Sequence, residues 1–223
     1  MHALRHENRS AQMAALRQLV EEKFPSPSSA SPSRRLLTGC PFLDQQGGLR
    51  RGALTEICGP AAGGQIALIS LLKMAQREGL LTGLIDAADS FEPADWPESQ
   101  LRRLLWVRSG QVDLALKAAD YLLRDGNIPL LVADLQIAPP RQLRRISAST
   151  WHRFHRVIEN SATMLVLLTP YPMVEGVTVR MALQTGFRLN ALHERRATLM
   201  LQLKGQIFER GQAPDFTLLA KSA

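Results

Sequence analysis

A glycine-rich stretch between a predicted strand and a predicted helix is the part of this 223-residue chain that most resembles a binding or catalytic motif. Its residues run Gly59-Pro60-Ala61-Ala62-Gly63-Gly64-Gln65-Ile66. The outer glycines fit the pattern G-x-x-x-x-G-K-[ST], in which backbone N–H groups cradle the phosphates of a nucleotide. Gln65 occupies the lysine position and Ile66 the Ser/Thr position. Lysine neutralises phosphate charge and the hydroxyl holds Mg²⁺, so the stretch predicts a phosphate-binding loop without its charged and metal-binding groups.

The motif alone leaves two interpretations open. An ordinary turn from a strand into a helix also favours glycine, because glycine adopts conformations that other residues avoid. Backbone N–H groups at the start of a helix still attract an anion weakly without a lysine. The elements on either side of the turn are therefore needed to distinguish the two interpretations.

Apolar runs alternate with helical stretches along the body of the chain. Strands are predicted at 53–58, 83–87, 104–107, 129–134 and 163–168, and helices at 65–77, 111–124 and 141–159. Continuous apolar runs separated by helices indicate an α/β fold with a mostly parallel sheet covered by helices. Shorter runs at 187–189, 198–203 and 216–219 predict antiparallel strands that extend one edge of the sheet.

An amphipathic helix is predicted before this core, over residues 10–24. Its apolar positions recur at spacings of three and four, and they are Met13, Leu16, Val20 and Phe24. A Pro/Ser-rich linker follows. We therefore divide the chain into an N-terminal helix and linker (1–33) and an α/β core with C-terminal strands (34–223). The apolar stripe of the helix is the candidate partner-docking element.

Composition and charge exclude several classes of protein. No apolar run reaches the length of a membrane span, and the N-terminus lacks the apolar region of a secretory signal. Cys40 and Cys58 are too far apart for a Cys-x-x-C zinc motif. The net charge is +7, and 22 of the 27 basic residues are arginine, which suits an anionic partner or a solvated surface. We expect a cytoplasmic protein without metal or cofactor.

Basic residues gather on the predicted helix at 141–159. Spacings near four and seven place on one face the candidate DNA or anion contacts Arg141, Arg145, His152 and Arg156. Trp151 and Phe154 are interleaved with them and could stack on bases. A helix that covers a sheet has the same pattern, with solvated arginines and aromatics turned to the core. Both interpretations stay open at this point.

The segments that flank the glycine-rich turn resemble the RecA recombinase family. The similar segments are Thr38-Gly39-Cys40-Pro41-Phe42-Leu43-Asp44 (T-G-x-x-x-L-D), Gly47-Gly48-Leu49 (G-G-L) and the run from Gly52 to Pro60 (G-x-x-x-E-I-x-G-P). Leu84-Ile85-Asp86-Ala87, followed by Phe91-Glu92-Pro93, is similar to the family's I-D-A-E…D-P segment. Asp134 then stands where the Walker B aspartate is expected. The resemblance covers about residues 36–220 and implies a RecA-like core.

The departures from the family pattern imply a pseudo-ATPase rather than an enzyme. Besides Gln65 and Ile66, Ala88 stands where the family has the glutamate that activates water, and alanine cannot act as a base. Asp89 is one residue further on, where a side chain points in another direction. After the fifth strand, Thr169-Pro170-Tyr171-Pro172 leaves little room for the family's nucleotide-sensing glutamine and long DNA-binding loop.

Among RecA-like chains, the N-terminal helix, the linker and the core look most like the ImuA family. This resemblance implies a non-catalytic, nucleoid-associated accessory protein of the SOS response to DNA damage that acts in translesion DNA synthesis and DNA repair. Its implied partners are RecA, an ImuB-type polymerase homologue and an error-prone polymerase, with weak or indirect contact to DNA. The alternatives are a SulA-like cell-division inhibitor and a RecA-like ATPase with an aberrant P-loop.

Overall fold

The computed structural model describes residues 35–159, 161–187, 191 and 193–209. The predicted N-terminal helix, with Met13, Leu16, Val20 and Phe24, lies outside the described residues, as does the predicted strand at 216–219. The division of the chain at residue 33 and the docking role of the helix therefore stay predictions. No described helix is both long and apolar enough to cross a membrane.

A sheet of seven strands forms the centre of the described core, in the order β5-β4-β6-β7-β3-β8-β9. Neighbouring strands run parallel except for β8 and β9, which are antiparallel. A separate antiparallel ladder of β1 and β2 precedes β3. The strands are β1 (Arg35–Leu36), β2 (Leu49–Arg50), β3 (Ala53–Cys58), β4 (Thr82–Asp86), β5 (Leu104–Arg108), β6 (Leu130–Asp134), β7 (Met164–Thr169), β8 (Val179–Leu183) and β9 (Gly205–Glu209).

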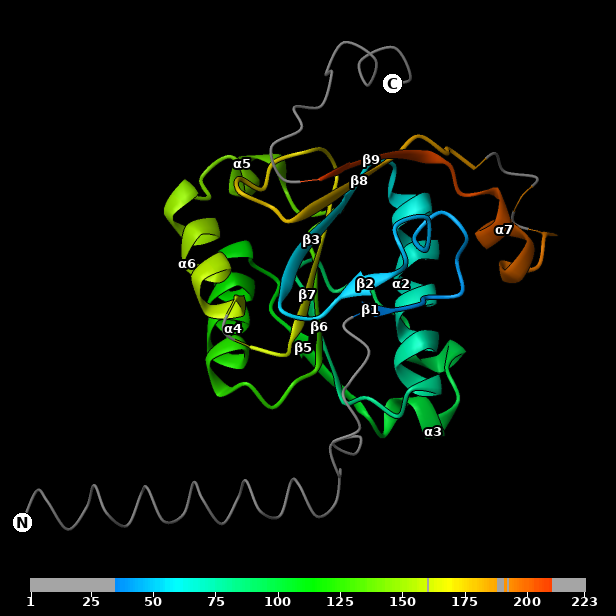
Figure 1. Cartoon of the computed structure of the whole chain (residues 1–223), viewed down its shortest axis with the longest axis horizontal. Helices are drawn as coiled ribbons and strands as arrows, with labels where there is room; N and C mark the ends of the chain where they lie inside the picture. The colour runs from blue at the N-terminus through cyan, green and yellow to red at the C-terminus, as the bar shows by residue number, and fades with distance from the viewer. Residues whose placement is uncertain (1–34, 160, 188–190, 192, 210–223) are drawn as a thin grey trace, which may run out of the picture. The chain divides into compact units, whose positions relative to one another are not determined.

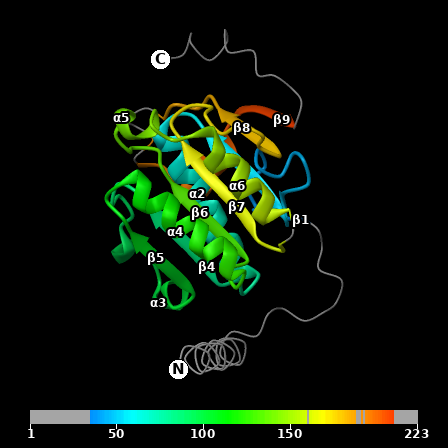
Figure 2. The ribbon, with the colours of Figure 1, turned by 90° about the vertical axis from the view of Figure 1, so that its left-hand side faces the viewer.

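Helices cover both faces of this sheet (Figure 1, Figure 2). On one face α2 (Ala61–Arg77) packs into an apolar core, and on the other face α4 (Val112–Asp125) and α6 (Ala148–Ile158) pack into a second core. The shorter helices are η1 (Pro93–Asp95), α3 (Glu98–Leu101), α5 (Pro140–Leu143) and α7 (Arg196–Gln202). The predicted architecture, a mostly parallel sheet between helices with an antiparallel C-terminal pair, is confirmed.

The continuous apolar runs of the sequence become the inner strands. Every residue of β3, β4, β6 and β7 is buried, because helices cover both faces of the sheet. The strand predicted at 53–58 coincides with β3, and each of the other four predicted core strands lies within one residue of β4, β5, β6 or β7.

The single basic helix predicted at 141–159 is wrong, because the chain forms α5 and then α6. Pro140 begins α5, which ends at Leu143, and a hydrogen-bonded turn continues through Arg145. Ser147 then caps α6, its hydroxyl oxygen accepting a hydrogen bond from the Ser149 N–H at 3.2 Å. Arg141 and Arg145 therefore do not share a helix face with His152 and Arg156.

The predicted strand at 198–203 is also wrong, since residues 198–202 belong to α7. Leu199, Met200 and Leu203 pack against the core that surrounds α2, and their spacing of three and four fits a helix. The strand that pairs with β8 is β9, which begins at Gly205. A Cβ on Gly205 would lie 2.2 Å from the Ala182 carbonyl oxygen, so this start requires glycine.

The residues of the T-G-x-x-x-L-D segment form the turn that follows β1. The Asp44 carboxylate accepts hydrogen bonds from the N–H and hydroxyl of Thr38, at 2.7 and 2.9 Å, and from the Gly39 N–H at 2.8 Å. Gly48 has φ of 84°, and a Cβ there would lie 2.1 Å from the Leu36 carbonyl oxygen. The motif therefore fixes the backbone that leads into β3.

A buried carboxylate on β3 holds the connection between β7 and β8. Glu56 is fully buried, and its Oε2 lies 2.5 Å from the Arg180 Nε on β8. Its Oε1 accepts hydrogen bonds from the Thr169 hydroxyl and from the Met173 and Val174 N–H groups, at 2.9, 2.9 and 3.2 Å. One side chain thus joins two strands to the loop between them.

We predict that Glu56→Ala lowers the free energy of unfolding by about 3–5 kcal/mol, because the substitution leaves the partly buried Arg180 charge without a carboxylate partner. Urea titration followed by circular dichroism measures the loss. Glu98→Ala is the matched control, since Glu98 pairs with Arg102 on the surface and such pairs contribute at most about 1 kcal/mol. Equal losses in the two variants would contradict the assigned role of Glu56.

Candidate functional site

The glycine-rich stretch forms the first turn of α2 rather than an open loop. The helix begins at Ala61, four residues before the predicted start at Gln65. The Gly64 N–H donates to the Pro60 carbonyl oxygen at 3.1 Å, as in an ordinary helix. A phosphate cradle needs such N–H groups to face the ligand. At Gly64 this donor is already used within the helix.

Protein side chains and backbone fill the space beside the glycines. A Cβ on Gly64 would lie 1.7 Å from the Gln136 Nε2, and a Cβ on Gly63 would lie 3.3 Å from the Thr185 carbonyl oxygen. Gln136 follows β6 and is 5% exposed. Its Nε2 and Oε1 atoms are buried without a hydrogen-bond partner among the described residues. Gly63 and Gly64 therefore allow close packing of α2 against neighbouring segments.

Gln65 and Ile66 join the protein interior. The Gln65 amide donates from Nε2 to the Asp134 Oδ2 at 3.1 Å, and Ile66 is buried in the core around α2. The Gln136 N–H donates to the Asp134 Oδ1 at 3.0 Å. Asp134, which stands at the predicted Walker B position, thus accepts hydrogen bonds at both carboxylate oxygens, one from the segment after β6 and one from α2.

Two carboxylates lie side by side at the carboxyl ends of β4 and β6. Asp86 and Asp134 are register partners, and both are buried. The Asp86 Oδ2 accepts a hydrogen bond from the Phe91 N–H at 2.8 Å. Burial raises the pKa of Asp134 to about 6, and the Asp86 carboxylate adds to this effect, while hydrogen bonds from Gln136 and Gln65 oppose it.

The position of the activating glutamate holds no base. Ala88 follows β4, and the next residue, Asp89, has φ of 56°. The Asp89 carboxylate forms two hydrogen bonds with the Arg108 guanidinium, at 2.6 and 2.5 Å, which hold its pKa below the usual value. Asp89 is therefore engaged by a cation on β5. In the described part of the chain, no three His, Cys, Asp or Glu side chains form a group that could hold a metal ion.

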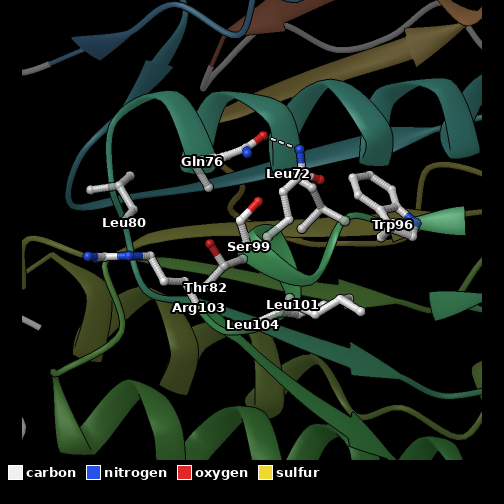
Figure 3. Close-up of a pocket in the computed structure, with 11 residues that line it drawn as sticks. Leu72, Gln76, Leu80, Thr82, Trp96, Ser99, Leu101, Arg103 and Leu104 are labelled. Atoms are coloured by element: carbon white, nitrogen blue, oxygen red, sulfur yellow. Dashed lines mark hydrogen bonds between the residues drawn. The ribbon is translucent and has the colours of Figure 1, made fainter. Parts of the chain in front are cut away.

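A small cavity lies between the second half of α2, α3 and the start of β5 (Figure 3). Its volume is about 30 Å³, and a hydrogen bond between Gln76 and Gln100 spans part of its wall. This volume suits about one water molecule, which is far smaller than a nucleotide. The two thiols are no better candidates for chemistry, because both are buried and burial raises the pKa of Cys58 to about 12.

The structure separates the predicted DNA or anion contacts into two groups. Arg141 and Arg145 are exposed on α5 and its following turn, while His152 and Arg156 are exposed on α6. His152 lies 4.0 Å from the Glu175 carboxylate. Trp151 is 2% exposed and Phe154 is fully buried. The two aromatics thus belong to the core, and the contact role of the four basic residues stays a prediction.

Sequence reasoning missed two residues that shape this region. Gln136 fills the space beside Gly64, and its only signal was its place two residues after the predicted Walker B aspartate. Glu56 belonged to a recognised segment, but its partner Arg180 lies 124 residues further along the chain. Contacts across such separations leave no local pattern.

Comparison with known proteins identifies the chain as a distant homologue of RecA. It is 28% identical over 148 residues to Protein RecA of Ectopseudomonas oleovorans, a match that covers 59% of this chain and 42% of that protein. It is 33% identical over 91 residues to Protein RecA of Chlorobium chlorochromatii, covering 40% and 26%. The match to Protein RecA of Rhizobium leguminosarum bv. viciae is 24% identical over 205 residues, covering 76% and 58%.

These matches each span less than two thirds of the RecA protein concerned. No family model matches the chain. Together with the order and direction of its strands, the distant homology assigns the described core to the RecA-like superfamily.

We predict that Asp134→Asn raises the free energy of unfolding at pH 8 by about 1–3 kcal/mol. The pKa of Asp134 is about 6 in the folded state, whereas an aspartate in the unfolded chain has a pKa of about 3.9. The folded state therefore binds this proton more tightly than the unfolded chain does. The stabilisation from this proton is therefore complete below about pH 4 and is lost as pH rises through about 6. Asparagine carries no charge, so the advantage of the variant should shrink as the pH falls.

Urea titrations between pH 4.5 and pH 8, compared at each pH, measure this difference. Asp113→Asn, at an exposed carboxylate on α4, is the control for general effects of losing a charge. A difference between Asp134→Asn and the wild type that does not change with pH would refute the assigned cause.

Proposed function

We propose that this chain is a non-catalytic RecA-like accessory protein of the ImuA type, acting in SOS-induced mutagenesis and translesion DNA synthesis. It would bind RecA, an ImuB-type polymerase homologue and an error-prone polymerase through protein surfaces. One observation carries the proposal. At the start of α2, where the RecA-like fold would bind phosphate, the Gly64 N–H is bonded to Pro60 and the Gln136 side chain fills the space. The resemblance of the whole chain to the ImuA family supplies the biological context.

The first support comes from the chemistry of the α2 start. A nucleotide brings several negative charges, yet the buried carboxylates Asp86 and Asp134 lie at the adjacent ends of β4 and β6, with Asp134 bonded to Gln65. Gln65 supplies one amide donor and no charge, and it is already bonded to Asp134. Repulsion between phosphates and carboxylates would oppose binding unless a cation intervened. This environment favours a role without nucleotide hydrolysis.

The second support is an open sheet edge. β5 is the last strand at one end of the sheet, and only β4 pairs with it among the described strands. Thr82 donates to the Arg103 carbonyl and Ser109 donates to the Asp86 carbonyl, so the odd-numbered residues of β5 direct their backbone groups toward β4. The N–H and C=O groups of Leu104, Trp106 and Arg108 therefore point toward the open side.

Exposed apolar side chains occur both on β5 and on α4. Leu105 on β5 is 41% exposed, and Leu114 and Tyr121, seven residues apart on α4, are 47% and 74% exposed. An extended segment of a partner can add to an open strand edge through its backbone while its side chains pack on such residues. We infer that β5 and α4 form a docking surface for RecA.

We predict that the wild-type chain does not bind a fluorescent ATP analogue in the presence of Mg²⁺. We also expect the variant Gln65→Lys/Ile66→Thr to show no binding, because the Gly64 N–H stays bonded to Pro60 and Gln136 still occupies the space beside it. Fluorescence anisotropy with RecA as the positive control measures this. Mg²⁺-dependent and saturable binding by the wild type would instead favour an ATPase with an aberrant P-loop.

We further predict that the full-length chain binds RecA or the ImuB-type polymerase homologue in biolayer interferometry. Leu105→Glu should weaken RecA binding at least about tenfold, since a charge would be buried against the added strand. Leu16→Asp tests the predicted arm in the same way. Leu201→Glu is the matched control, because Leu201 is 68% exposed on α7, away from β5.

The outcomes separate the parts of the proposal. If the chain binds neither RecA nor the ImuB-type homologue, the proposed accessory function is wrong. Binding that survives Leu105→Glu unchanged would overturn only the assignment of the β5 edge.

A further inference from the structure

Three arginines project from one turn of the chain, at α5 and directly after it. Arg141, Arg144 and Arg145 are all exposed. The Arg144 and Arg145 N–H groups donate to the Pro140 and Gln142 carbonyls, each at 3.1 Å, so the backbone stays helical through this turn. Residues three and four apart on a helix share a face, with Cβ atoms about 5–6 Å apart. The three guanidinium groups therefore project into solvent from the same side of the turn.

The turn that carries them is fixed to the core. Pro140 limits the backbone at its start, and the Leu143 side chain is 1% exposed in the core around α4 and α6. The Gln142 Oε1 accepts a hydrogen bond from the Val112 N–H at the start of α4, at 2.9 Å. The arginines are thus held on a backbone that needs no ordering when a ligand binds.

These charges are not neutralised within the described residues. Other arginines have carboxylate partners, for example Arg108 with Asp89 and Arg180 with Glu56. In the described part of the chain, no carboxylate lies within ion-pair distance of Arg141, Arg144 or Arg145. Asp113 follows Val112 on α4 without forming such a pair. Like charges at these spacings repel, so an anionic ligand would stabilise the turn.

The neighbouring side chains indicate which anion fits. Ile137 is 56% exposed and lies four residues before Arg141 on the same connection. Trp151 and Phe154, the two aromatics near these arginines in sequence, are buried in the core and do not offer a stacking surface for bases. A carboxylate fits the planar fork of arginine through two hydrogen bonds, and an aliphatic residue beside it could pack on Ile137.

We propose that the α5 turn is a docking site for an acidic protein segment that carries an aliphatic side chain. Its carboxylates pair with Arg141, Arg144 and Arg145, and its aliphatic residue packs on Ile137. The site does not depend on the proposed binding of RecA, because it rests on the charges and packing of this turn alone.

Fluorescence anisotropy with the full-length chain tests the proposal. The probe is a fluorescein-labelled peptide in which Asp-Glu pairs alternate with single leucines, and labelled poly-glutamate and oligo(dT) of equal length serve for comparison. We expect saturable binding of the peptide, weakened by added salt because the contacts are ionic. Arg144→Gln and Arg145→Gln should each weaken binding about tenfold.

Ile137→Ser should weaken the binding of the leucine-containing peptide several-fold and leave the binding of poly-glutamate unchanged. Arg195→Gln is the matched control, since Arg195 is an exposed arginine at the start of α7 and should bind as the wild type does. Circular dichroism of each variant checks that its fold is retained.

Two results would overturn the proposal. One is the absence of saturable peptide binding, or binding that Arg144→Gln and Arg145→Gln leave unchanged. The other is oligo(dT) binding that is tighter than peptide binding and is lost in these two variants. That result would assign the turn to single-stranded nucleic acid. Loss of RecA binding in the earlier experiment would leave the peptide result unaffected.

Discussion

The start of α2 packs against the carboxyl edge of the sheet with no room for a side chain. A Cβ on Gly64 would meet the Gln136 amide, and a Cβ on Gly59 would lie 2.5 Å from the Leu183 carbonyl oxygen. This close approach sets where the helix begins. It also brings Gln65 to Asp134 and turns Ile66 into the core. The glycines are thus required by packing, whether or not a phosphate ever binds there.

The difference between residues needed for packing and residues needed for chemistry explains why the chain still resembles RecA. The residues that carry the resemblance hold the backbone: Asp44 closes the turn after β1, Gly48 permits its contact with Leu36, and Glu56 joins β3 to β8. The positions that differ from the family pattern are those where chemistry would occur, at Gln65, Ile66 and Ala88. A fold depends on the packing of many residues, whereas a reaction depends on a few chemical groups. A chain can therefore lose the catalytic groups and keep the fold.

The sequence predicted the sheet well because buried strands are continuous apolar runs. It failed where one pattern fits two structures. Leu199, Met200 and Leu203 suit a strand or a helix, and contact with the core around α2 selects the helix. The break between α5 and α6 did have a local signal, since Ser147 is a favoured helix cap.

At the site, the absence of the lysine and of the metal-binding hydroxyl, at Gln65 and Ile66, was visible in the sequence. The side chain that occupies the space was not, because Gln136 meets Gly64 only in the folded chain. Long-range packing, rather than local preference, therefore decides whether a glycine-rich turn is open or filled.

The two proposed protein surfaces meet at the first turn of α4. Gln142 of the α5 turn binds the Val112 N–H, and Leu114, part of the surface beside β5, is two residues further along the same helix. Arg141 and its neighbours supply charge, while β5 supplies backbone groups and apolar contacts. An acidic segment at α5 and an extended segment at β5 can therefore belong to one partner. Linking two contacts raises the effective concentration of the second, so each can be weak alone and still support stable binding.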